Sequence, residues 1–166
     1  MILSLASYHS DDAAWSKTMG DLYVNNWLGT SGAYFSDIMF NAIGRAAWLL
    51  PVAMVGYAYF AVLKNDHAID IENFFFKALG FTIFLMVAAT LLNFYHPDAS
   101  ILKRGGIIGQ TLASLLNSSL TLLPGIQAGS ALCTTLSKGV LLALLVVTGS
   151  LATGTGPLLW IDGLGA

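Results

Sequence analysis

Charged residues are scarce in this chain: they make up 10% of its 166 residues, against roughly 25% in an ordinary soluble domain. Hydrophobic residues make up 56%, and the mean hydropathy is +0.73. A water-soluble sphere of this size cannot hide so many apolar side chains in its interior. The composition therefore predicts a membrane protein, with room for three to five crossings at about 20 residues each.

Residues that carry chemistry are scarce as well. The seven Lys and Arg are scattered along the chain, with only Lys103 and Arg104 adjacent, and the net charge is −2. The chain therefore lacks the basic stripe that nucleic-acid binding needs. Cys133 is the only cysteine, which excludes an intramolecular disulfide and a site built from several thiolates. His9, His67 and His96 share no metal-ligand spacing, and no phosphate-binding loop is present. We predict no catalytic residue, no cofactor and no metal.

The first 37 residues divide into a short apolar stretch and a polar one. Residues 1–6 are apolar but too few to cross a bilayer, and we interpret them as the end of a longer helix. Residues 8–37 are polar and turn-rich, with Trp15, Trp27 and Tyr34 among them. Amphipathic rings favour the membrane–water interface, so we predict an interfacial loop.

Three apolar runs follow, and they predict three crossings. The first covers 38–63 and contains one charge, and the second covers the charge-free run 78–95, after a polar loop at 64–77. The stretch 96–130 is only moderately hydrophobic, and the third crossing is placed at roughly 133–156. The predicted fold class is therefore all-α, a polytopic membrane helical bundle.

An amphipathic helix is predicted inside the stretch 96–130. Its leucines recur at steps of three and four residues, with polar residues between them: Leu112, Leu115, Leu116, Leu120 and Leu123. We interpret this helix as interfacial or re-entrant rather than spanning. Lys138 would lie near the middle of a span drawn over 128–150. A lysine at the centre of the bilayer costs free energy, so we place the crossing later.

Two charges and several glycines are candidates for a role within the membrane. Asp37 and Arg45 are eight residues apart, so on one helix they would share a face, with Asp37 capping the helix N-terminus. Arg45 is either functional or extends its head to the lipid headgroups. Gly105 with Gly109, and Gly149 four residues before Thr153, have the small-residue spacing that allows close helix packing.

One ordered set of motifs is more specific than any of these features. It runs Ser7-Tyr8, Asp11-Asp12, Trp15-Ser16, Asn26-Trp27-Leu28-Gly29, Gly32-Ala33-Tyr34, Asp37, Phe40, Gly44 and Leu49-Leu50-Pro51. Farther along come Gly105-Gly106-Ile107-Ile108-Gly109 and Thr148-Gly149. This order resembles the N-terminal membrane domain of FtsK-type DNA translocases, the bacterial division proteins related to SpoIIIE.

The resemblance implies four transmembrane helices with both ends in the cytoplasm, of which this chain would lack most of the first. Residues 8–37 and 96–130 would then be periplasmic and 64–77 cytoplasmic. The implied location is the bacterial inner membrane at the division septum. The family's motor and its DNA-reading domain are not among these residues, so we expect no nucleic acid to bind here.

The implied function is to anchor a translocase that acts in cell division and chromosome segregation. The expected partners are the lipid bilayer, other division proteins and further copies of the chain, by resemblance six. The residues expected to make partner contacts are Trp15, Trp27, Tyr34, Asp37 and Arg45, with Gly105, Gly109 and Gly149 in helix packing. Two alternatives stay open: a small transporter or channel subunit with Arg45 and Lys138 along a polar path, or a structural division protein without a motor.

Overall fold

The fold is known from a computed structural model. It describes residues 1–15, 24–64, 71–95, 105–122, 125, 127 and 130–153. For 57–64 and 71–74 it describes the backbone only. The elements are helical: α1 (Ile2–Ala6), α2 (Gly29–Ile43), the 3-10 helix η1 (Gly44–Trp48), α3 (Leu49–Lys64), α4 (Ile71–Tyr95), α5 (Gly106–Leu120) and α6 (Ala131–Thr153). The predicted all-α class is confirmed.

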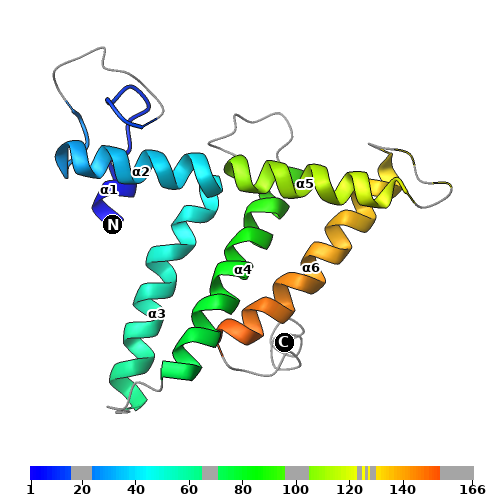
Figure 1. Cartoon of the computed structure of the whole chain (residues 1–166). Helices are drawn as coiled ribbons and strands as arrows, with labels where there is room; N and C mark the ends of the chain where they lie inside the picture. The colour runs from blue at the N-terminus through cyan, green and yellow to red at the C-terminus, as the bar shows by residue number, and fades with distance from the viewer. Residues whose placement is uncertain are drawn as a thin grey trace.

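Two sets of helices run in different directions. Figure 1 shows α3, α4 and α6 descending together, while α2 and α5 lie crosswise along one end of them. Within the described residues, three helical stretches are long and apolar enough to cross a membrane: Gly29–Gly56, Phe75–Tyr95 and Ala131–Thr153. This arrangement supports a polytopic helical bundle in which α2 and α5 lie across one end of the other helices.

The first apolar stretch bends sharply at Gly44. Its φ of 58° and ψ of −139° lie in a region that side chains disfavour, so a glycine is needed where α2 ends. The backbone then continues through η1 into α3, which runs away from α2 (Figure 1). Pro51 is tolerated in the first turn of α3, where the N–H groups need no partner within the helix.

Several expectations about segment boundaries were wrong. Residues 29–37 form the first part of α2 rather than a loop, and 71–77 form the start of α4. Asp37 lies well inside α2, whose N-cap is Leu28, so it does not cap a helix. Because the chain turns at Gly44, Asp37 and Arg45 do not share one helix face.

The remaining boundaries agree more closely with the apolar pattern. The predicted amphipathic helix corresponds to α5, and the last apolar run corresponds to α6. Leu123 and residues 154–156 lie outside the described part of the chain, as do His67 and His96. Which segments face which side of a membrane stays a prediction.

A glycine motif fixes α5 against its neighbours. A Cβ on Gly105 would overlap the carbonyl of Ala89 in α4, and a Cβ on Gly109 would lie 2.5 Å from the same oxygen. Gly106 has a φ of +65°, and its Cβ would lie 2.5 Å from the backbone carbonyl of Ala42 in α2. These three glycines therefore let α5 approach the backbones of two helices at once. Gly149 is buried in α6.

Candidate functional site

The N-terminal cap, defined here as residues 1–15 and 24–43, is built around the buried carboxylate of Asp12. Its Oδ1 accepts hydrogen bonds from the backbone N–H of Asn25 at 2.8 Å and from the Asn25 side chain at 3.1 Å. Its Oδ2 accepts the backbone N–H of Asn26 at 2.9 Å. Asp12 is 2% exposed, and these donors offset the cost of burying its charge.

Asn26 connects three parts of the cap through its side chain. Its Nδ2 donates to the carbonyl oxygens of Ser4 at 2.9 Å and Ser7 at 3.3 Å. The same group donates to the hydroxyl of Ser36 at 3.4 Å, and Oδ1 accepts the backbone N–H of Leu28 at 3.1 Å. One amide thus joins α1, the segment before α2 and α2 itself.

Close packing of α1 on α2 completes this network. The hydroxyl of Ser4 donates to the carbonyl oxygen of Gly32 at 2.6 Å, and both residues are buried. A Cβ on Gly32 would overlap the side-chain oxygen of Asn26. Gly32 is therefore needed for space, and the cap is a fixed structure rather than a loop.

Tyr8 and Asp37 form a second polar contact in the cap. Burial, the charge of Asp37 and a side-chain hydrogen bond with it raise the pKa of Tyr8, with smaller contributions from Asp11 and Asp12. The Asn41 side chain donates to the Asp37 carboxylate at 2.9 Å. Asp37 is only 2% exposed, so its carboxylate lies inside the cap and is not available on the surface.

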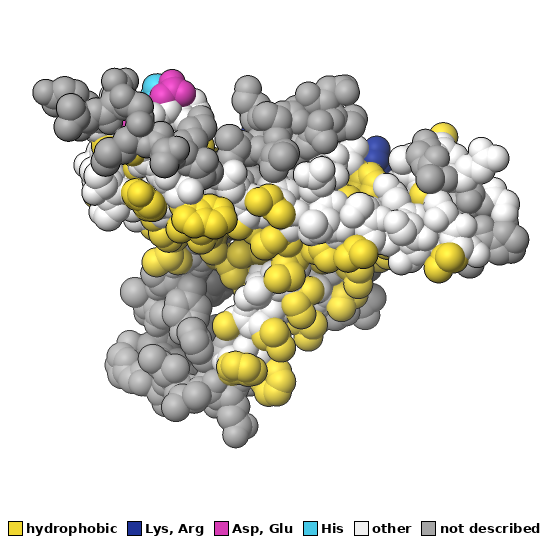
Figure 2. All heavy atoms as spheres, turned by 45° about the horizontal axis from the view of Figure 1, so that its top comes forward, with side chains coloured by type: hydrophobic (Ala, Val, Ile, Leu, Met, Phe, Trp, Pro, Cys, Tyr) yellow, Lys and Arg dark blue, Asp and Glu magenta, His cyan; other side chains and the backbone are white. Residues whose placement is uncertain are grey.

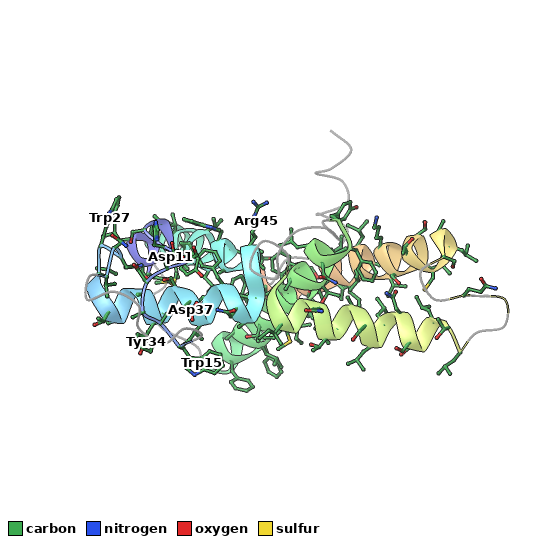
Figure 3. The ribbon with its side chains drawn as sticks, turned by 90° about the horizontal axis from the view of Figure 1, so that it is seen from above. Asp11, Trp15, Trp27, Tyr34, Asp37 and Arg45 are labelled. Atoms are coloured by element: carbon green, nitrogen blue, oxygen red, sulfur yellow. The ribbon has the colours of Figure 1, made fainter. Side chains whose placement is uncertain are left out.

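The aromatic residues expected to contact partners are exposed but do not form one patch. Trp15 is 69% exposed, Trp27 72% and Tyr34 46%. Figure 3 shows Trp27 on one side of α2, with Trp15 and Tyr34 on the other. The backbone N–H of Trp27 donates to the hydroxyl of Ser7 at 3.0 Å, so its indole projects from a fixed backbone.

Arg45 and Lys138 are not brought together. Arg45 is exposed on η1 and projects outward from the bend (Figure 3). Lys138 is partly buried on α6, and its ammonium lies 4.8 Å from the centre of the Tyr95 ring of α4. Figure 1 shows α4 between the descending α3 and α6. The two cations therefore do not line a common path.

Other polar groups join α5 to α6. The side-chain oxygen of Asn117 accepts the hydroxyl of Ser137 at 3.2 Å and lies 3.7 Å from the thiol of Cys133. Cys133 is buried, as predicted for a small apolar side chain. Within the part of the chain that the structure describes, no three His, Cys, Asp or Glu residues converge as metal ligands do.

Apolar and polar side chains occupy different regions of the surface. Figure 2 shows hydrophobic side chains gathered below α2 and α5, whereas acidic and histidine side chains lie at the top of the view. The exposed apolar residues include Val52, Met54, Phe75, Phe76 and Leu79, which lie on α3 and α4. This distribution suits helices that face lipid beside a cap that faces water.

Sequence reasoning missed the two residues that organise the cap. Asp12 and Asn26 belong to the family-like motifs, but the motifs by themselves assign no role to either. A local signal exists, because Asp and Asn side chains commonly satisfy backbone N–H groups in irregular segments. The partner, however, lies fourteen positions away and is not visible from spacing alone.

Comparison with known proteins agrees with this architecture. The family model described as the 4TM region of DNA translocase FtsK/SpoIIIE matches residues 1–165. No solved structure matches the chain. The matching family model thus covers both the cap and the spanning helices.

Similar proteins are named DNA translocase FtsK. The chain is 29% identical to that of Vibrio vulnificus (strain CMCP6) over 73% of its own length and 12% of the relative. Identity is 27% with the Pseudomonas putida (strain KT2440) protein, over 71% of the chain and 15% of the relative. Identity is 25% with the Shewanella oneidensis (strain MR-1) protein, over 82% of the chain and 16% of the relative.

The chain thus spans less than a fifth of each of these relatives. The matched family model describes a membrane region, so these residues correspond to that region and not to an ATPase motor. The resemblance drawn from the motifs is confirmed, and the chain belongs to the family of membrane regions described as the 4TM region of DNA translocase FtsK/SpoIIIE.

Proposed function

We propose that this chain anchors a DNA translocase in the bacterial inner membrane at the division septum. The observation that carries the proposal is the family match over residues 1–165, in a chain with three helices suited to membrane crossing. Its work there is targeting, oligomerisation and contact with other division proteins. Movement of DNA would belong to other parts of the full translocase.

The cap supports the part of the proposal that concerns partners. Its buried polar network holds the backbone around Trp27 and leaves the indole 72% exposed. A rigid aromatic side chain loses little conformational entropy when it binds, which makes it an effective contact. The same indole in a bare bilayer would instead lie among the headgroups. Both roles place the cap at the membrane surface, on the periplasmic side by family resemblance.

Oligomerisation is proposed to use the outer faces of the spanning helices. The three glycines at 105, 106 and 109 are engaged inside the chain, between α5, α4 and α2. They are therefore not free to form contacts between copies. A ring of six copies, the number expected from the resemblance, would join through exposed faces of α3, α4 or α6.

The test follows the chain in dividing cells. The chain fused to a fluorescent protein should concentrate at the septum, and Trp27→Ala should reduce this enrichment while the protein stays in the membrane fraction. Leu115→Ala is the matched control, because Leu115 is an exposed apolar residue on α5, away from the cap and from the helix faces proposed to join copies. Uniform distribution of the unmodified fusion around the cell would contradict septal anchoring. Loss of membrane association by Trp27→Ala would assign Trp27 to lipid anchoring instead.

Two other functions make different predictions. A transporter or channel using Arg45 and Lys138 would give solute flux in liposomes that depends on both residues; their separate positions on η1 and α6 argue against it. A structural division protein without a motor would show a stop codon directly after Ala166. A reading frame that continues into a Gly-x-x-x-x-Gly-Lys-Ser/Thr motif would support the translocase.

A further inference from the structure

We draw no further inference here: the strongest candidate, the exposed apolar face of α6 that carries Gly139 and Ala143 between Leu136 and Val147, is a stripe of small residues on an unpartnered helix face, and nothing in the structure shows what covers it.

Discussion

The carboxylate of Asp12 accepts the backbone N–H of Asn26 at 2.9 Å, although the two residues are fourteen positions apart. Asn26 in turn holds α1 and the residue after it, because its side chain donates to the carbonyl oxygens of Ser4 and Ser7. One buried carboxylate therefore fixes both the segment before α2 and the short helix α1. The family motifs Asp11-Asp12 and Asn26-Trp27 therefore have a structural role, because the hydrogen bond between Asp12 and Asn26 holds the cap together.

Asp12→Ala should destabilise the cap by about 2–3 kcal/mol, because backbone N–H groups lose their acceptor in a buried place. The measurement is thermal unfolding in detergent followed by tryptophan fluorescence, with hydrogen exchange at the amides of Asn25 and Asn26. Asp11→Ala is the matched control. Asp11 is exposed and lies 3.9 Å from His9, a surface contact worth little. Equal stability of the two variants would show that the Asp12 network does not hold the cap.

Gly109→Ala should destabilise the bundle by about 1–3 kcal/mol, since the new methyl group would lie 2.5 Å from the Ala89 carbonyl and push α5 off α4. Unfolding by sodium dodecyl sulfate, followed by far-UV circular dichroism, measures the change. Gly139→Ala in α6 is the control, because a methyl group there would meet nothing within 4 Å and alanine favours helix. A Gly109→Ala protein as stable as Gly139→Ala would mean that α5 is free to shift.

Tyr8 should make the cap sensitive to alkaline pH. Its pKa is raised above the ordinary value of 10.0 by burial and by Asp37. The folded state therefore holds the phenol proton more tightly than the unfolded state does. Its contribution to stability is complete below pH 10 and is lost as the pH rises through the raised pKa.

Tyr8→Phe should flatten the fall in stability above pH 10, measured as the unfolding temperature at increasing pH. Asp37→Asn should instead shift the tyrosinate absorbance of Tyr8 toward lower pH, because the negative charge that favours the neutral phenol is gone. The difference between the titrations of the unmodified protein and Tyr8→Phe isolates this residue. An unchanged Tyr8 titration in Asp37→Asn would exclude the assigned contact.

The spanning helices were predictable because their signal is local. The charge-free run 78–95 identifies α4, a long apolar run with Lys138 as its one charge identifies α6, and leucines at steps of three and four identify α5. The start of α2 was missed because Gly29, Thr30, Ser31 and Gly32 are weak helix formers, and packing against α1 overrides this local preference.

The bend at Gly44 was missed for a different reason. A glycine inside an apolar run is compatible with a continuous membrane helix, and nothing in the sequence states that its φ is 58°. The role of Asp37 depended on this point, since a straight helix from residue 38 would have placed it at the N-terminus. Its actual neighbours, Tyr8 and Asn41, become visible only when the cap is folded.

The contact between Lys138 and Tyr95 should couple α6 to α4. The ammonium lies 4.8 Å from the ring centre, a cation–π geometry worth about 0.5–1 kcal/mol at a partly exposed site. A double-mutant cycle with Lys138→Gln and Tyr95→Leu, read out by unfolding in sodium dodecyl sulfate, should give a coupling energy of this size. Tyr95→Phe keeps the ring and should retain the coupling, whereas a cycle of Lys77→Gln with Tyr95→Leu should give none. Additive effects in the Lys138 cycle would show that the lysine is held by solvent or lipid headgroups and not by the ring.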